Sequence, residues 1–388
     1  MSDFFAVAIP GLEPIVAAEL LALGVAGRVE EGGVAWSGAA TSLYTAALHL
    51  RSASRLFVRL GEFQARWFPE LERHARRIDW TRILPADAPV ALRVTARKSR
   101  LYHERAIAER LLAVIREAVP GATLAPAPGS ARAAAAADDD GAPGDAQLVV
   151  VRFLRDACSI SADAAGALHM RGYRQAVAKA PLRETLAAAL LLAVGYDGAE
   201  PLLDPFCGAG TIPTEAALIA RRIPPGLATA DRIPRVHAFQ AWAGFDAGAW
   251  LRLTEAARAG IVSAAAAPIV GSDRDEGAVV AARANAARAG VGDDVSFERR
   301  ALSDAPVPAG VGLLLTNPPY GVRVGRTRDL RDLYAALGNL VRQRLAAWRV
   351  AFLSADAGLA AHTGLVLESR LTTRNGGIRV DLMKGGPR

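Results

Sequence analysis

Short apolar segments alternate with helical patterns from about residue 181 to the end of the chain, and this alternation constrains the fold more than any other feature. Strands are predicted near residues 201, 268, 295, 312 and 349, with a terminal pair near 366 and 379. Strands that alternate with helices favour a mostly parallel sheet with helices on both faces. The sequence therefore predicts an α/β fold with a seven-stranded sheet, in which ligands bind outside the carboxyl ends of the strands.

A glycine-containing loop follows the first of these strands. Residues 204–211 read DPFCGAGT and precede a helical pattern. Gly208 and Gly210 allow a ligand to approach the backbone closely, and Asp204 can accept hydrogen bonds from a cationic amine. A dinucleotide site requires a third glycine, so that pyrophosphate meets a helix N-terminus, and an aspartate here would repel phosphate. The loop favours a ligand with a positively charged head over NAD, with a purely structural glycine turn as the alternative.

Two acids follow the second predicted strand, in the segment 268–275 (PIVGSDRD). An acid at this strand end is where α/β nucleoside-binding folds hold both ribose hydroxyls. Asp273 is the candidate for that role, with Arg274 packing beside the adenine. Asp275 is the better candidate for the N-cap of the next helix, so the two roles fall to different aspartates.

The segment Asn317-Pro318-Pro319-Tyr320 follows an apolar run over residues 311–316 that is predicted to be a buried strand. The Asn317 oxygen and the Pro318 carbonyl can both accept hydrogen bonds from one exocyclic amine. Tyr320 can lie against the heterocycle that carries this amine. The alternative is a turn after a strand, because Asn-Pro is itself a turn signal. We refer to these four residues as the clamp.

Together these motifs resemble those of the S-adenosylmethionine-dependent amino-methyltransferases. Residues 168–174 (LHMRGYR), 180–187 (APLRETLA), 237–242 (HAFQAW) and 375–377 (NGG) extend the resemblance to the THUMP-containing RNA methyltransferases. Within that group the chain is most similar to the branch that makes N2-methylguanosine in 23S ribosomal RNA, with the transfer RNA guanine-N2 methyltransferases as near relatives. The resemblance implies a Rossmann-like class I methyltransferase domain whose last strand is antiparallel.

The same reading assigns roles to individual residues. Those expected to bind S-adenosylmethionine are Thr185, Asp204, Phe206, Cys207, Gly208, Gly210, Asp273 and Arg274, and those expected to hold the target base are Asn317, Pro318, Pro319 and Tyr320. One departure concerns an acid that often holds the adenine amino group in this family. Residues 301–302 read Ala-Leu here, so the nearest acid, Asp304, is the candidate.

The amino-terminal part is predicted to hold two α+β units ahead of a catalytic domain at 166–388. Residues 1–60 form a ferredoxin-like unit, and residues 61–165 form a THUMP-like RNA-binding unit closed by a strand over 147–154. Residues 121–146 are rich in alanine, proline, glycine and aspartate, and this composition predicts a disordered surface loop.

Cationic residues gather around Tyr102 and His103. The cluster consists of Arg93, Arg97, Lys98, Arg100 and Arg105, and is expected to contact the RNA backbone without reading its sequence. Arg51, Arg55 and Arg59 alternate along a strand predicted over 51–60, and their outward-facing side chains would extend the same face. A solvated connection between a strand and a helix is the alternative interpretation of the cluster.

The overall composition is that of a soluble globular protein with a basic balance. The chain has 388 residues and a net charge of +7, which favours a polyanionic partner. Its two cysteines exclude a disulfide framework or a zinc site, and its six histidines lack the spacing of metal ligands. The amino terminus lacks a signal-peptide pattern, and the longest apolar run, 186–194, is too short to span a membrane. These features predict a cytoplasmic, metal-free monomer.

The sequence thus predicts an S-adenosylmethionine-dependent RNA methyltransferase that acts on an exocyclic base amine, with guanine N2 of 23S ribosomal RNA implied by the resemblance. A transfer RNA guanine-N2 methyltransferase and a DNA or RNA adenine-N6 methyltransferase are the alternatives, because the clamp fits adenine N6 equally well. A catalytically silent RNA-binding protein is a further alternative, although the intact acid, glycines and clamp count against it. A dinucleotide oxidoreductase is disfavoured by the missing third glycine.

Overall fold

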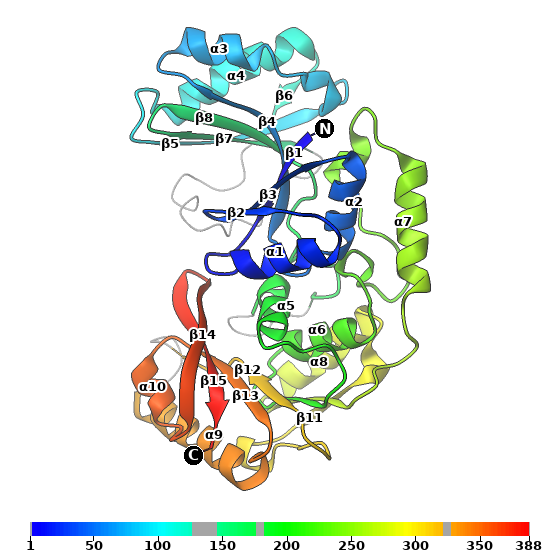
Figure 1. Ribbon diagram of the computed structural model, residues 1–388, viewed down its shortest axis with the longest axis vertical. Helices are drawn as coiled ribbons and strands as arrows, with labels where there is room; N and C mark the ends of the chain where they lie inside the picture. Colours follow the sequence, from blue (N-terminus) through cyan, green and yellow to red (C-terminus); the bar gives the residue numbers. More distant parts are fainter. Residues whose placement is uncertain (1, 126–145, 176–181, 321–326, 388) are drawn as a thin grey trace.

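The computed structural model describes residues 2–125, 146–175, 182–320 and 327–387, and these residues form two sheets (Figure 1). Most of the predicted loop over 121–146 lies outside the described residues. So do residues 180 and 181 of the motif at 180–187, and Gly321 after the clamp.

The amino-terminal sheet runs without interruption in the order β2-β3-β1-β4-β8-β7-β5-β6. Its strands are β1 (Ser2–Val7), β2 (Arg28–Glu30), β3 (Gly33–Gly38), β4 (Arg55–Gln64), β5 (Pro89–Arg97), β6 (Thr123–Leu124), β7 (Gln147–Leu154) and β8 (Ala157–Asp163). The helices among them are α1 (Glu13–Ala22), α2 (Ala40–His49), α3 (Phe68–Ala75) and α4 (Glu104–Ala118). Alternate strand residues face these helices, as the pleat requires.

The strand β8 joins the two predicted amino-terminal units into one sheet. It pairs with β7 on one side and with β4 on the other, from Phe57 opposite Asp163 to Gln64 opposite Ala157. The strand at 147–154 has the predicted bounds but does not close the second unit, because β8 follows it. The domain boundaries near residues 60 and 165 stay predictions.

The carboxy-terminal sheet has the order β11-β10-β9-β12-β13-β15-β14. Its strands are β9 (Leu202–Asp204), β10 (Ile269–Asp273), β11 (Val295–Arg299), β12 (Leu313–Thr316), β13 (Arg349–Ser354), β14 (Val366–Asn375) and β15 (Ile378–Gly386). The helices among them are α5 (Glu184–Ala193), α6 (Thr211–Ala220), α7 (Ala247–Ala259), α8 (Glu276–Arg288), α9 (Thr327–Arg344) and α10 (Ala357–Ala361). Of these described strands, β15 alone points in the direction opposite to the other six. This order confirms the predicted Rossmann-like sheet and its antiparallel last strand.

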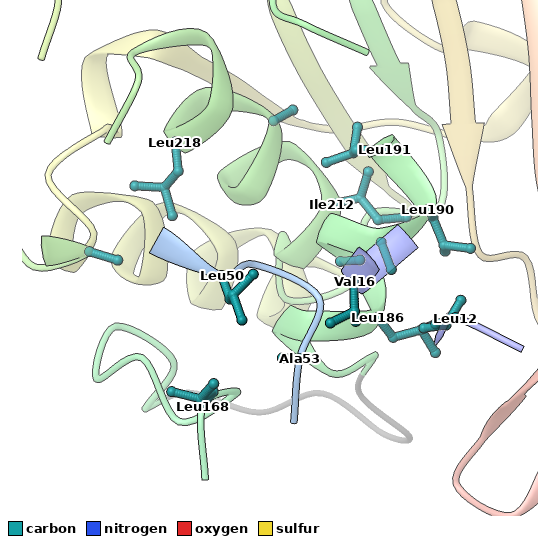
Figure 2. Packing of buried hydrophobic residues seen from close by; sticks show 14 of the residues in the cluster. Leu12, Val16, Leu50, Ala53, Leu168, Leu186, Leu190, Leu191, Ile212 and Leu218 are labelled. Carbon is teal, nitrogen blue, oxygen red and sulfur yellow. The ribbon is translucent and has the colours of Figure 1, made fainter. Parts of the chain in front are cut away.

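One apolar core connects the ferredoxin-like unit to the catalytic domain. Figure 2 shows Leu12, which directly precedes α1, and Val16 of α1 beside Leu186 and Leu190 of α5. The same cluster includes Leu50 and Ala53 ahead of β4 and Ile212 and Leu218 on α6. Burial of this surface is the main favourable term that holds the two parts together.

A buried ion pair lies at the same junction and explains the motif at 168–174. The side chains of Arg171 and Glu215 are both 0% exposed and approach to 2.6 Å. The Tyr173 hydroxyl donates to the other Glu215 oxygen at 2.7 Å, and Arg171 also donates to the backbone carbonyl of Arg51 at 2.6 Å. The motif therefore ties the segment after β8 to both α6 and the amino-terminal unit.

The prediction of an outward-facing arginine strand at 51–60 is wrong. Arg55 is buried and ion-paired with Asp163, and Arg51 precedes β4 and donates to the Ile223 carbonyl at 2.7 Å. Arg59 is half-buried and pairs with Glu30. These guanidinium groups are held by internal acceptors, so Arg51 and Arg55 are removed from the RNA-binding candidates.

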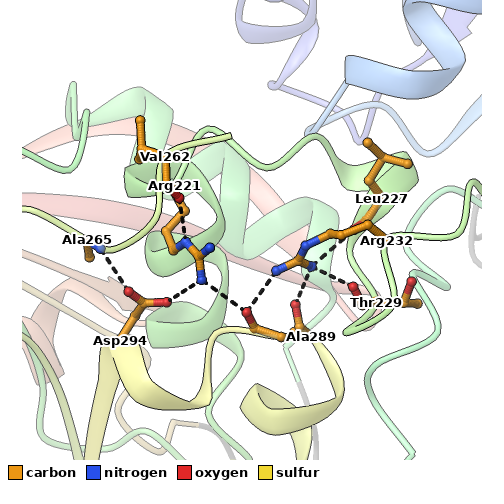
Figure 3. A network of polar contacts seen from close by, with 9 residues as sticks. Arg221, Leu227, Thr229, Arg232, Val262, Ala265, Ala289 and Asp294 are labelled. Carbon is orange, nitrogen blue, oxygen red and sulfur yellow. Dashed lines mark hydrogen bonds and ion pairs between the residues drawn. The ribbon is translucent and has the colours of Figure 1, made fainter. Parts of the chain in front are cut away.

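A second polar network connects the segments that follow α6 and α8 (Figure 3). Arg221, after α6, donates to the Val262 carbonyl at 2.9 Å and contacts Asp294 at 3.1 Å. Arg232 donates to the Ala289 carbonyl, at the end of α8, at 2.7 Å. Internal acceptors therefore hold the guanidinium groups of both arginines.

Candidate active site

Three neighbouring strands of the carboxy-terminal sheet end in polar residues at the same edge. β9 ends at Asp204, β10 ends at Asp273, and Asn317 follows the last residue of β12. β9 lies between the other two strands. The next strands in the chain, β10 and β11, lie on one side of β9, and the later strands β12 and β13 lie on its other side. This switch in strand order is where doubly wound folds bind ligands.

The Asp204 carboxyl is buried and has no cationic partner among the residues that the structure describes. It is 1% exposed and accepts hydrogen bonds from the Thr316 hydroxyl at 2.5 Å and the Phe206 backbone N–H at 3.1 Å. Within the described part of the chain it forms no ion pair. Burial raises the pKa of Asp204 to about 7, with a smaller contribution from Asp273 in the same direction. A bound cation would stabilise the carboxylate and lower this pKa.

The two glycines of the loop have different roles. Gly208 has a φ of +52°, and a Cβ built there would meet no atom within 4 Å, so its open side can receive a ligand. Gly210 has a φ of +81° and begins α6, and a Cβ there would lie 2.8 Å from Ala282 and 2.9 Å from the Phe297 ring. The expectation of ligand approach therefore applies to Gly208, whereas Gly210 allows close packing between α6, α8 and β11.

Asp273 shapes the loop from the neighbouring strand. Its carboxylate accepts hydrogen bonds from the backbone N–H groups of Gly208 and Asp275, at 3.1 and 3.0 Å. Each carboxylate oxygen keeps acceptor capacity for a further donor, so a role with ribose hydroxyls remains compatible with these contacts. Asp275 caps α8 by accepting from the Gly277 N–H at 2.9 Å, which confirms its predicted structural role.

The other predicted cofactor residues differ in exposure. Cys207 is buried, and burial raises the pKa of its thiol, which suits an inert space-filling residue. Phe206 is half-buried beside it, whereas Arg274 and Asp304 are exposed, the latter on a short 3-10 helix at Leu302–Asp304. The adenine contacts assigned to Arg274 and Asp304 stay predictions.

The clamp holds a buried acceptor at Asn317. Asn317 Oδ1 is buried and has no hydrogen-bond partner among the residues that the structure describes. Buried polar atoms are rarely left without a partner, so this oxygen is a candidate for contact with a ligand donor. Pro318 is buried, Pro319 and Tyr320 are half-buried, and the Tyr320 hydroxyl accepts a hydrogen bond from Asn375 Nδ2 at 2.6 Å.

Two further buried hydroxyls near strand or helix ends lack partners in the described ranges. Thr185 Oγ1 lies in the first turn of α5, and Ser272 Oγ lies one residue before Asp273. Thr185 was expected at the cofactor site, but Ser272, Thr316 and Asn375 were missed. Ser272 and Thr316 could have been found from their position, because each is a polar residue at the end of an otherwise apolar strand.

These residues fit S-adenosylmethionine. A buried carboxyl with no cation beside it in the described part of the chain suits the amine of this ligand. The open side of Gly208 leaves room for its chain, and Asp273 stands where the ribose hydroxyls of such folds bind. The aspartate at the loop and the single G-x-G pattern do not fit a pyrophosphate.

Comparison with known proteins identifies the family. Residues 171–382, more than half of the chain, match the family described as RMKL-like methyltransferase domain, and residues 3–57 match the RlmL ferredoxin-like domain. The chain belongs to the RMKL-like methyltransferases. This match confirms the predicted family and the ferredoxin-like fold of the amino-terminal residues.

Two curated relatives of this RMKL-like methyltransferase are similar over almost its whole length. A protein of Synechocystis sp. named as a candidate RNA methyltransferase is 32% identical over 98% of this chain and 96% of its own. The ribosomal RNA large subunit methyltransferase K/L of Syntrophotalea carbinolica is 35% identical over 98% of this chain. The chain spans about half (53%) of the length of that second relative.

Solved structures resemble the RMKL-like methyltransferase along the entire chain. SMU.472, a candidate methyltransferase solved with S-adenosylhomocysteine, has a TM-score of 0.86 and 28% identity, covering 100% of this chain and 98% of its own. A protein of Listeria monocytogenes named as a candidate N6-adenine-specific DNA methylase has a TM-score of 0.83 and 29% identity, covering 100% of this chain and 96% of its own. The family and the bound S-adenosylhomocysteine support S-adenosylmethionine as the methyl donor.

A patch with basic and aromatic side chains forms where three segments of the RMKL-like methyltransferase meet. Arg100 N–H donates to Asp156 at 2.8 Å, and the Ala65 N–H donates to the Asp156 carbonyl at 2.9 Å. The exposed side chains of this basic patch are Arg66, Trp67, Arg97, Lys98, Arg100, Tyr102, His103, Arg105 and Arg155. Trp67 was missed by the sequence analysis, although it is 51% exposed with the Arg100 guanidinium 5.3 Å from its ring centroid.

Arg93 differs from the other predicted RNA contacts, because it is half-buried on β5. Its role in RNA binding stays a prediction.

Among the described residues, none of the helices has the length and apolar character needed to span a membrane. No group of three or more histidine, cysteine or acidic side chains in the same ranges is arranged to hold a metal ion.

Proposed function

We propose that this chain is an S-adenosylmethionine-dependent RNA methyltransferase that methylates N2 of a guanine in 23S ribosomal RNA. The observation that carries the proposal is the buried Asn317 oxygen, which has no partner among the described residues and lies at the sheet edge that it shares with Asp204 and Asp273. An acceptor in this place suits a base amine brought next to a bound methyl donor. A transfer RNA guanine is the closest alternative substrate.

The clamp residues act by holding the amine. An exocyclic amine is a poor nucleophile because its lone pair is delocalised into the ring. Asn317 Oδ1 and the Pro318 carbonyl each accept one of its hydrogens, which directs the lone pair toward the methyl group. When bound, S-adenosylmethionine supplies that methyl group in an electrophilic form on a sulfonium centre. The catalytic contribution of the chain is positioning and electrostatics, and the proton leaves after transfer, when the nitrogen has become acidic.

Tyr320 supports the base rather than the amine. A paired base must be extruded before it can enter the site, and extrusion costs a few kcal/mol of unstacking and unpairing. Stacking on the Tyr320 ring, which packs against apolar residues of the catalytic domain, offsets part of this cost. Base–aromatic stacking does not discriminate between bases, so Tyr320 serves guanine and adenine alike.

The choice of substrate rests on similarity. The two curated relatives are named for RNA and ribosomal RNA, whereas one solved homologue is named for adenine N6 of DNA. The basic patch supports RNA, because exposed aromatic rings among cations suit unpaired bases and phosphates. Guanine N2 is favoured over adenine N6 only by the family resemblance.

Single-turnover methylation distinguishes the substrates. Unmodified ribosomal RNA and transfer RNA are each incubated with excess protein and radiolabelled S-adenosylmethionine, digested to nucleosides and separated. We expect labelled N2-methylguanosine from ribosomal RNA. Labelled N6-methyladenosine would overturn the substrate assignment while leaving the clamp mechanism intact. If neither ribosomal RNA nor transfer RNA is labelled and double-stranded DNA is labelled instead, the RNA proposal is overturned.

Removing charge from the basic patch is expected to weaken RNA binding without changing cofactor binding. The double variant Arg97→Gln/Arg100→Gln should raise the RNA Kd and reduce the salt dependence of log Kd by about 0.7 for each phosphate that the protein no longer neutralises. Fluorescence anisotropy over a salt series measures both quantities. Arg252→Gln, an exposed arginine on α7, is the charge control. An unchanged Kd and slope in the double variant would mean that the patch is only a solvated surface.

A further inference from the structure

A hydrogen bond joins the clamp to the last hairpin of the chain. Asn375 Nδ2 donates to the Tyr320 hydroxyl at 2.6 Å, across 55 residues of sequence. Asn375 is the last residue of β14 and pairs with Ile378 at the start of β15. Gly376 and Gly377 form the turn between them, with φ values of +54° and +83°. Two central residues with positive φ are typical of tight hairpin turns, so the turn presents the Asn375 amide in a defined direction.

This contact fixes the long axis of the Tyr320 ring. The hydroxyl oxygen lies on the axis about which the ring turns, so a bond to it holds the axis while leaving rotation of the plane to neighbouring contacts. The plane is limited by packing, because the half-buried ring contacts the apolar clusters on both faces of the carboxy-terminal sheet. The Tyr320 side chain is therefore fixed at one end by the backbone of the clamp and at the other end by the hydrogen bond from Asn375 to its hydroxyl.

The hairpin itself is supported from both sides of the strand β14. The Thr372 hydroxyl bonds to Asp381 across the pair of strands. On the other side, Gly11 of the amino-terminal unit packs so closely on β14 that a Cβ at Gly11 would collide with the Thr372 carbonyl oxygen. The strand that carries Asn375 is thus braced by a residue of the ferredoxin-like unit.

We propose that Asn375 is a positioning residue, which holds the Tyr320 ring in the orientation that stacks on the extruded base. The proposal rests on the function proposed above, because it requires that Tyr320 receive a base. Asn375 touches neither the target amine nor the donor in this scheme. Its contribution passes entirely through the Tyr320 hydroxyl.

A double-mutant cycle tests this dependence. Asn375→Ala and Tyr320→Phe each remove one partner of the same hydrogen bond, so each should lower the single-turnover methylation rate by about three- to tenfold, with RNA and S-adenosylhomocysteine affinities unchanged. The double variant Asn375→Ala/Tyr320→Phe should be no slower than Tyr320→Phe alone. If the two losses multiply, or if Asn375→Ala has the wild-type rate, the positioning role is overturned.

A second measurement does not depend on activity. Burial raises the pKa of Tyr320, and the Asn375 hydrogen bond opposes this rise by stabilising the phenolate. Asn375→Ala should therefore raise the pKa of one tyrosine in a spectrophotometric titration, and this change should vanish in a Tyr320→Phe background. Asn339→Ala makes the same substitution on α9, away from the hairpin, and serves as the matched control, with unchanged rate and titration.

Different results would contradict the positioning role of Asn375 and the proposed methyltransferase function. If Asn375→Ala leaves the tyrosine titration unchanged, the hydrogen bond is absent in solution and the positioning role is overturned, whatever the substrate. If the titration changes as expected but Tyr320→Phe and Tyr320→Ala both methylate RNA at the wild-type rate, Tyr320 has no role in stacking and the positioning proposal falls with that part of the mechanism. If Asn317→Ala loses methylation while both Tyr320 variants keep it, that loss still supports the proposed function.

Discussion

Asn317→Ala is expected to lower the rate of methyl transfer by more than about a hundredfold, the size of effect seen when a preorganised hydrogen-bonding group is removed from an active site. The Asn317 oxygen is buried and has no partner among the described residues, so the fold does not depend on it for a hydrogen bond. The variant should bind S-adenosylhomocysteine with the wild-type Kd, because the side chain is assigned to the base and not to the cofactor.

Single-turnover kinetics and calorimetric titration separate these two expectations. Asn339→Ala makes the same substitution on α9, where the side chain accepts an exposed hydrogen bond from Arg342, and provides the matched control. A wild-type methylation rate in Asn317→Ala would contradict the clamp mechanism. Loss of both methylation and S-adenosylhomocysteine binding would assign Asn317 to the cofactor instead.

Asp204→Asn is expected to weaken S-adenosylhomocysteine binding by about ten- to a hundredfold, the range for losing a hydrogen bond to a charged group. The amide can still accept from the Thr316 hydroxyl and the Phe206 N–H, so the loop should keep its shape. NAD should bind neither protein. Calorimetric titration measures these affinities, and an unchanged Kd in Asp204→Asn would show that the carboxylate does not hold the ligand amine.

The raised pKa of Asp204 gives this prediction a pH dependence. The ligand amine requires the carboxylate form, so wild-type affinity should fall as the pH is lowered through about 7, and Asp204→Asn should lack this inflection. The stability of the ligand-free protein should change in the opposite direction. Because the folded carboxyl binds its proton more tightly than the unfolded one, its contribution to stability is lost as the pH rises toward and through 7. Thermal melts of both proteins over a pH series measure this second effect.

The sequence contained enough to predict the catalytic sheet. Apolar strands such as β10 and β12 are short, buried on both faces and followed by polar residues, which is the pattern of parallel strands with a ligand edge. The predicted positions of Asp204, Asp273 and Asn317 at one edge follow from that pattern alone. The distinct roles of Gly208 and Gly210 do not, because they depend on where Phe297 and Ala282 lie.

The errors came from contacts between residues far apart in the chain. Arg55 reads as a surface residue on a strand, but its partner Asp163 lies 108 residues later and makes burial possible. The strand β8 was missed because its alternation of buried Cys158, Ile160 and Ala162 is short and weakly apolar. Asn375 appeared only as part of a hairpin motif, since nothing local indicates that its amide meets Tyr320.

The apolar core shared by α1 and α5 bears on how this architecture can be divided or recombined. Leu12 and Val16 would lose part of their packing if the catalytic domain were cut away, since their neighbours include Leu186 and Leu190 (Figure 2). A truncated catalytic fragment would in turn expose that face of α5 to water and to aggregation. The two parts therefore share one core, and we expect a chimera that exchanges the ferredoxin-like unit to lose stability unless the residues of α1 and α5 that meet in this core are matched.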